Sequence, residues 1–276
     1  MFKQEKKIKE PAWLSNAPLP QSFRSIFKWG DKDKFKNPNS GFFRVIAEDL
    51  GLSEADVQQS LRPGNKIVES PAEKKISAQD ISVFESIVGS ENMDMDTYSR
   101  LRFATGKSME DILNLREERI ENISDLVLHP ETCEDIEAIV RHCHEKKIAV
   151  HVYGGGSSVT QGLSCPKGGV TLVMNTHMNR VIEFNETNHT ITVESGMMGP
   201  VYEDMLNRAP EVFQAGGSYT GGHFPQSFEH SSVGGWIVTL GSGQASSYYG
   251  DACDLVISQT WVSPGGTFKT HDYPAT

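Results

Sequence analysis

Apolar and polar positions follow two different patterns along this chain, and the change falls near residue 123. Before it, the apolar spacing is helical. Candidate helices span residues 41–50, 53–61, 78–88 and 108–119. Prolines interrupt the first 71 residues repeatedly, while aromatic residues cluster between Trp13 and Phe43. Because disordered tails are usually poor in aromatic residues, we expect residues 1–122 to form an irregular and then mainly helical N-terminal arm.

From residue 123 onward, short apolar runs alternate with a helical pattern. Strands are expected at 126–128, 148–152 and 171–174, with a helix beginning at Thr132. Thr132 and Asp135 have the spacing of a capping box, in which each side chain bonds the backbone of the other residue. The pattern predicts a β-α-β-loop-β unit over residues 123–177.

A third stretch, residues 178–276, has a different organisation. Its expected elements are a hairpin at 181–184 and 190–194, a helix at 198–207, a strand at 255–262 and a turn at 264–266. Pro200 stands near the start of that helix, a position that proline favours. We expect this stretch to form a second subdomain.

Three consecutive glycines, Gly154, Gly155 and Gly156, directly follow the expected strand at 148–152. Consecutive glycines allow the backbone to approach a ligand and turn several N–H groups toward one point, which is an arrangement that binds phosphate oxygens. A triple glycine in isolation is more often a flexible turn. Its place after a strand favours a phosphate-binding loop.

Two other phosphate-binding motifs do not fit the sequence. The dinucleotide fingerprint requires glycine where Val159 stands, followed by a helix. The nucleoside-triphosphate loop would place a glycine at Leu101, five residues before Gly106. We interpret residues 106–108 instead as the start of a helix, with Ser108 as its N-cap.

Residues 152–162 resemble the pyrophosphate loop of the vanillyl-alcohol-oxidase (p-cresol methylhydroxylase, PCMH) type of FAD-binding domain. Residues 222–236 are similar to the second flavin-contacting segment of that family, and 239–243 and 249–251 continue it. Within this family the chain looks most like the alkylglycerone-phosphate synthases. That likeness is carried by residues 27–31, 115–117, 125–130, 178–180, 193–196 and 229–236.

The resemblance implies an α+β fold, with a two-subdomain PCMH-type FAD-binding domain, incomplete at its C-terminus, after the arm. The cap domain that holds substrate would be absent. The residues that would bind the cofactor are Val152, Tyr153, Gly154, Gly155, Gly156, Ser157, Ser158, Val159 and Gly162 in the loop and Gln226, Ser227, Phe228, Glu229, His230, Ser231, Ser232, Gly234, Gly235, Val238, Thr239, Leu240 and Gly241 in the second segment.

Histidines bear on both flavin attachment and catalysis. Covalent members of the family often use a loop histidine, but here the loop has serines and the nearest histidine, His151, lies on the preceding strand. The expectation is non-covalent FAD. His223 and His230 are candidates for acid or base catalysis, or for hydrogen bonding in a packed loop. The residues that perform catalysis in the synthases would lie beyond this chain.

Three functions remain open at this point. The resemblance implies part of a synthase of ether-lipid synthesis, which exchanges the acyl group of an acylated dihydroxyacetone phosphate for a long-chain alcohol. Leu240 stands where the synthases have an arginine, which keeps open an FAD-dependent oxidase or dehydrogenase of a 2-hydroxy acid or phosphorylated polyol. The third reading is a cofactor-binding fragment that is inactive alone.

Composition and motifs limit the classes of ligand and partner that the chain is expected to bind. The formal charge of -10 disfavours nucleic acid, because phosphate binding relies on an excess of Lys and Arg. No metal site is expected, since His142 and His144 face different sides of a helix. Four cysteines without a C-x-x-C pair, no secretory signal and no long apolar run predict an intracellular, cytoplasmic protein. A small-molecule or lipid-phosphate substrate is expected; peripheral membrane contact and a homodimer stay open.

Overall fold

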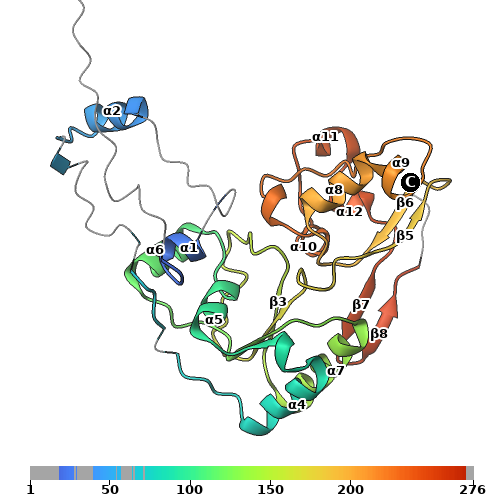
Figure 1. The fold of residues 1–276 in the computed structure, drawn as a ribbon, viewed down its shortest axis with the longest axis horizontal. Coiled ribbons are helices and arrows are strands. Elements are labelled where there is room, and N and C mark those ends of the chain that lie inside the picture. Colours follow the sequence, from blue (N-terminus) through green and yellow to red (C-terminus); the bar gives the residue numbers. More distant parts are fainter. Residues whose placement is uncertain are drawn as a thin grey trace, which may run out of the picture. The chain divides into compact units, whose positions relative to one another are not determined.

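The structure is a computed structural model that describes residues 19–27, 29, 40–53, 55–56, 64, 66–70 and 72–271 (Figure 1). Two compact units divide the chain. The smaller takes residues up to 69 together with 112–119, and the larger takes 70–111 with the residues from 120 onward. Residues 70–111 therefore cluster with the larger unit and not with the first part of the expected arm.

The smaller unit contains helices α1 (Phe23–Ile26) and α2 (Ser40–Asp49). Helix α2 confirms the helix predicted at 41–50, whereas most of the helix predicted at 53–61 lies outside the described residues. Helix α1 is preceded by an isolated bridge between Ser22 and Ile67. Helix α6 (Met109–Glu117) confirms the helix predicted at 108–119, and the hydroxyl of Ser108 accepts the backbone N–H of Asp111 at 3.1 Å as the expected N-cap.

The centre of the larger unit is a four-stranded sheet in the order β1-β2-β4-β3. Its strands are β1 (Met93–Asp94), β2 (Leu126–Leu128), β3 (Val150–Tyr153) and β4 (Val170–Val173). Strands β2, β4 and β3 are parallel, and β1 is antiparallel to β2. Every residue of β2 and β4 is buried, as expected for parallel strands that are covered on both faces.

Helices α4 (Ala78–Val88) and α7 (Cys133–Lys146) pack beside each other in one core with β2 and β4 (Figure 1). Phe84 and Ile139 are fully buried there. The predicted capping box of α7 is present, with the Thr132 hydroxyl accepting the Asp135 N–H at 3.1 Å. A second cluster, to which α5 (Thr97–Phe103) contributes its last residue, packs Phe103 with Val127 and Tyr153.

The second half of the larger unit is a series of short elements. They are β5 (Val181–Asn185), β6 (Thr190–Val193), α8 (Gly199–Asn207), α9 (Ala209–Val212), η3 (Phe228–His230), α10 (Val233–Val238), α11 (Ser246–Tyr249) and α12 (Ala252–Leu255). The β5–β6 hairpin and α8 confirm their predictions. Earlier in the chain, the short η2 (Ser90–Asn92) leads into β1.

The strand predicted at 255–262 is wrong in its first half. Asp251 and Asp254 form a capping box that closes a helical turn, α12, and that turn ends at Leu255. Extended pairing begins only at β7 (Thr260–Ser263), which pairs with β8 (Gly266–Lys269) across the turn predicted at 264–266. Helices together with parallel and antiparallel pairing confirm the predicted α+β class.

Candidate cofactor-binding site

The glycine loop begins where β3 ends, at the carboxyl edge of the parallel strands. Gly156 has a φ of 76°, which is a conformation that favours glycine. A Cβ at this position would overlap the hydroxyl group of Tyr153, whose ring is buried beneath the loop. The loop therefore turns tightly over a buried aromatic side chain.

Gly154 and Gly155 bring the loop against the second predicted segment. A Cβ at Gly154 would overlap the Ser232 hydroxyl, and one at Gly155 would overlap the carbonyl oxygen of His230. Only glycine leaves room for this approach. The glycine loop and the second segment, more than seventy residues apart in the sequence, thus meet at the carboxyl edge of the sheet.

A third segment, residues 106–107, also contacts the loop. The backbone N–H of Lys107 donates to the carbonyl oxygen of Ser158 at 2.6 Å. A Cβ at Gly106 would collide with the same carbonyl oxygen. In the sequence, the run 106–108 indicates only the start of a helix and carries no signal for this contact.

The loop presents backbone N–H donors that have no acceptor within the described part of the chain. Among the residues that the structure describes, none accepts a hydrogen bond from the backbone N–H groups of residues 155–159. The Ser158 hydroxyl instead shapes the loop, since it accepts the Gly162 N–H at 2.9 Å. Unused N–H groups in a glycine turn fit phosphate oxygens. The residues present therefore fit the diphosphate of a dinucleotide cofactor.

The second segment is held by its own hydrogen bonds. Ser232 caps α10 by accepting the Gly235 N–H at 3.2 Å. The indole N–H of Trp236 donates to the Ser231 hydroxyl at 2.6 Å, and both residues are buried. These bonds fix the backbone that faces Gly154 and Gly155, so the surface against the loop is preorganised.

The predicted site residues differ in exposure. Those that are exposed are Val152, Val159, Gly162, Gln226, Glu229, Val238, Thr239 and Leu240. Those that are buried are Tyr153, Gly156, Ser231 and Ser232. Those that are half-buried are Gly154, Gly155, Ser157, Ser158, Ser227, Phe228, His230, Gly234, Gly235 and Gly241. The buried residues support the loop and the second segment, while Val238 and Leu240, 63% and 66% exposed, offer apolar surface to a ligand.

The two candidate histidines lie in different surroundings. His223 is buried, packs edge-on against the Trp236 ring at 5.0 Å, and neither of its ring nitrogens has a hydrogen-bond partner in the described structure. Burial lowers the pKa of His223. Burial and the nearby Lys107 lower the pKa of His230. Both imidazoles are therefore biased toward their neutral forms. His151 faces the Gly168 carbonyl oxygen at 3.2 Å.

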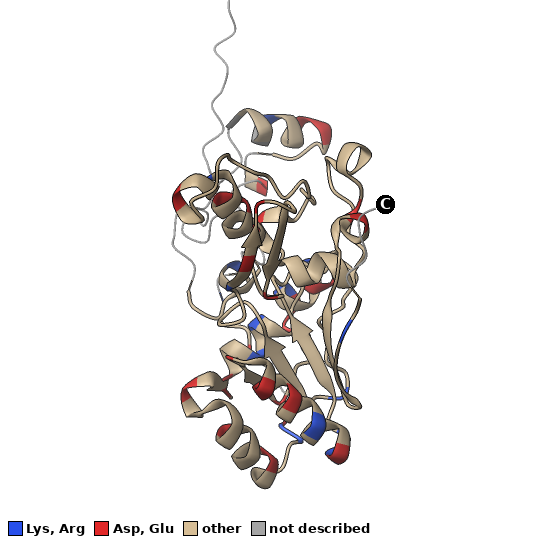
Figure 2. Cartoon of the chain, turned by 90° about the vertical axis from the view of Figure 1, so that its right-hand side faces the viewer, with Lys and Arg blue, Asp and Glu red and all other residues tan. Residues whose placement is uncertain are grey.

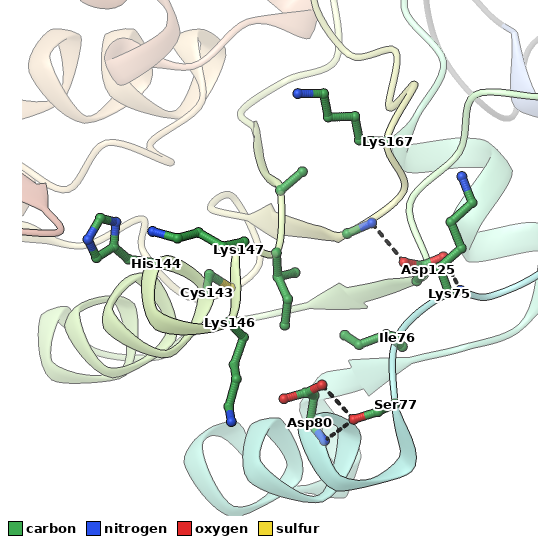
Figure 3. Close-up of a pocket in the computed structure, with 13 residues that line it drawn as sticks. Lys75, Ile76, Ser77, Asp80, Asp125, Cys143, His144, Lys146, Lys147 and Lys167 are labelled. Atoms are coloured by element: carbon green, nitrogen blue, oxygen red, sulfur yellow. Dashed lines mark hydrogen bonds between the residues drawn. The ribbon is translucent and has the colours of Figure 1, made fainter.

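A cavity of about 540 Å³ lies elsewhere, at the amino ends of the parallel strands (Figure 3). Its lining includes Lys75, Lys146, Lys147, Lys167, Asp125 and Cys143. The labelled lysine side chains point in different directions and do not converge on one point (Figure 3). The cavity and the glycine loop are therefore separate features, at opposite edges of the sheet.

Charge and metal chemistry add little to this picture. Acidic residues occur on several of the described helices (Figure 2). The described part of the chain contains no group of three His, Cys, Asp or Glu residues arranged to hold a metal ion. Within the same described part, no helix combines the length and the apolar character needed to cross a membrane.

Comparison with known proteins identifies the family. The model of the FAD-binding domain family matches residues 124–271, and the chain belongs to this family. Its cofactor is therefore FAD. An alkyldihydroxyacetonephosphate synthase from Dictyostelium discoideum is 31% identical over 177 residues, which are 63% of this chain and 28% of that protein. A mitochondrial D-lactate dehydrogenase (cytochrome) from Arabidopsis thaliana is 30% identical over 145 residues, which are 52% of this chain and 24% of that protein.

Solved structures agree in fold. A structure of alkyldihydroxyacetonephosphate synthase superposes with a TM-score of 0.66 at 26% identity, covering 72% of this chain and 37% of that chain. Substrate-bound p-cresol methylhydroxylase superposes with a TM-score of 0.55 at 15% identity, with the same coverage of both chains. The PCMH-type fold that the resemblance implied is confirmed. The chain spans well under half the length of these relatives.

Proposed function

We propose that this chain binds FAD non-covalently between the glycine loop and the second segment. In this proposal the backbone of residues 154–158 holds the diphosphate, and residues 226–241 line the flavin and the rest of the cofactor. The observation that supports it best is the close approach of Gly154 and Gly155 to residues 230–232. A flexible surface turn is not expected to pack this closely against another segment. The engagement of His151 with Gly168 supports non-covalent attachment.

We further propose that these residues form the FAD-binding part of a flavoenzyme that resembles the alkyldihydroxyacetonephosphate synthases and acts in ether-lipid synthesis. Residues 123–177 and 178–276 would be its two FAD-binding subdomains, preceded by the arm. The bound isoalloxazine would supply the reactive flavin, while this chain orients it. A lipid-phosphate substrate, peripheral membrane contact, a homodimer and an intracellular location belong to this proposal.

The second candidate function is an FAD-dependent oxidoreductase of a 2-hydroxy acid or a phosphorylated polyol. Similarity to a D-lactate dehydrogenase and the exposed Leu240 favour it. Anaerobic mixing of the parent enzyme with a 2-hydroxy acid separates the two. Lasting loss of the oxidised flavin absorbance supports the oxidoreductase and contradicts the synthase.

FAD binding, and not turnover, is the property we propose for these 276 residues by themselves. His223 is buried and neither of its ring nitrogens has a hydrogen-bond partner among the described residues, so no described group orients it as an acid or base. The test is the visible spectrum of the purified chain after incubation with FAD and removal of free flavin. Retained flavin absorbance is expected. A colourless chain of correct intact mass and normal folding contradicts the proposal.

A further inference from the structure

Lys107 occupies a fixed place beside the glycine loop. It follows the turn after α5, and its backbone N–H is bonded to the Ser158 carbonyl oxygen at 2.6 Å. The adjacent Gly106 leaves no room for a side chain at the same contact. Both backbone contacts are made with the Ser158 carbonyl oxygen and attach this segment to the loop, so the Lys107 side chain starts beside the glycine loop.

The Lys107 side chain also lies near the second segment. It is close enough to His230 to lower the pKa of that imidazole, and it is half-buried. His230 is the residue whose carbonyl oxygen faces Gly155. The lysine is therefore positioned where both halves of the proposed site meet.

The electrostatic surroundings favour an additional negative charge at this point. Burial lowers the pKa of Lys107 to about 8, although Asp111 acts to raise it, and the Arg102 guanidinium lowers it further. Arg102 stacks on the Phe103 ring at 5.1 Å, and that ring packs against Tyr153 beneath the loop. Lys107 is half-buried and Arg102 is exposed, and a bound anion would relieve both the desolvation of the lysine and its repulsion by the arginine.

We infer that Lys107 binds the diphosphate of FAD, adding an ammonium group to the backbone N–H groups of the glycine loop. This inference rests on the proposed FAD binding and names a side chain that acts in it. The loop itself carries no cationic residue between 152 and 162, while the diphosphate carries a negative charge on each phosphate. A lysine that arrives from a distant segment balances part of that charge.

The experiment compares FAD and riboflavin, which lacks both phosphates, as ligands of the full 276-residue chain. Dissociation constants are measured by flavin fluorescence for the wild type, Lys107→Met, Lys107→Arg and the control Lys75→Met. Lys75 lies at the opposite edge of the sheet and matches the lost charge. We expect Lys107→Met to weaken FAD about tenfold, a typical effect for a lost charged hydrogen bond. Riboflavin binding and the FAD affinities of the other two variants should stay near wild type.

The pH dependence is a second readout. The protonated lysine is the form that binds the diphosphate, so affinity should be constant below about pH 8 and fall above it. In Lys107→Arg the cation persists, and the affinity should stay level over the same range. This readout uses the wild type and therefore holds even when Lys107→Met does not fold.

The outcomes separate the two claims. If the wild type binds no FAD, the proposed function fails and the inference with it. If the wild type binds FAD but Lys107→Met binds it equally well with no fall above pH 8, only the inference is overturned. If Lys107→Met loses FAD and riboflavin to the same extent, Lys107 acts by supporting the fold beside Asp111, which also overturns the inference.

Discussion

The two edges of the central sheet handle backbone polar groups in opposite ways. At the amino edge, the carboxylate of Asp125 accepts the N–H groups of Lys75 at 2.9 Å and Gly169 at 2.8 Å. At the carboxyl edge, the N–H groups of 155–159 have no acceptor among the described residues. The amino edge has the cavity, but the carboxyl edge has the unmet hydrogen-bonding capacity. Unmet capacity, and not empty volume, identifies the candidate site.

Of the substitutions considered for the two edges, Gly155→Val should lower FAD affinity the most. The added side chain collides with the His230 carbonyl oxygen, which cannot move without displacing the second segment. We expect FAD affinity to fall about a hundredfold or more, with stability lowered by about 1–3 kcal/mol through overpacking. Titration with FAD and a thermal melt measure the two effects. A folded variant with wild-type affinity would show that the contact does not form part of the site.

Asp125→Ala should destabilise the protein at the amino edge of the sheet. Asp125 is 3% exposed, and its loss leaves two backbone N–H groups without their acceptor and the nearby buried Arg100 without a compensating charge. We expect a loss of about 3 kcal/mol in the free energy of unfolding. Urea denaturation measures it. Because the amino edge lies away from the proposed site, the FAD affinity of the folded protein should change less than about threefold. A larger change would show that the two edges of the sheet are energetically coupled.

Sequence patterns predicted most strands of the central sheet and helix α7, but not the segments that pack around the glycine loop. The buried runs of β2 and β4 and the capped helix α7 have strong local signals. Strand β1, with two residues, is too short to show periodicity. The turn of α12 depends on the Asp254 carboxylate, which accepts the Asp251 N–H at 2.8 Å, and the turn takes Leu255 out of the predicted strand, while residues 256–259 form no strand pairing. Gly106 contacts Ser158, and His223 contacts Trp236. Both are tertiary contacts, so no local sequence pattern predicts them.

Ser77→Ala should produce a smaller change, confined to the amino edge. Ser77 caps α4 by accepting the Asp80 N–H at 3.1 Å, and it lines the cavity. Loss of this cap should lower stability by about 1 kcal/mol. FAD affinity should be unchanged. A measurable drop in FAD affinity would mean that the cavity contributes to the site.

Thiol reactivity tests whether the cysteines that the structure buries, including Cys143 at the amino-edge cavity, are inaccessible, and it involves the smallest expected effect. Cys133 and Cys253 are exposed, whereas Cys143 and Cys165 are buried. Burial raises the pKa of Cys143 to about 12 and that of Cys165 to about 11, so both remain protonated and unreactive near neutral pH. A chromogenic thiol reagent should therefore label the two exposed cysteines in the native chain and all four after unfolding. Rapid labelling of Cys143 would show that the cavity opens to the core.

Amide hydrogen exchange of residues 155–159, measured with and without saturating FAD, tests directly whether the backbone of the glycine loop binds the cofactor. Exchange without FAD should be fast, because these N–H groups have no acceptor in the described structure. Bound FAD should slow exchange in this segment strongly, while the exchange of the bonded N–H groups of Lys75 and Gly169 should change little. FAD binding that leaves residues 155–159 exchanging at the free rate would contradict this proposal.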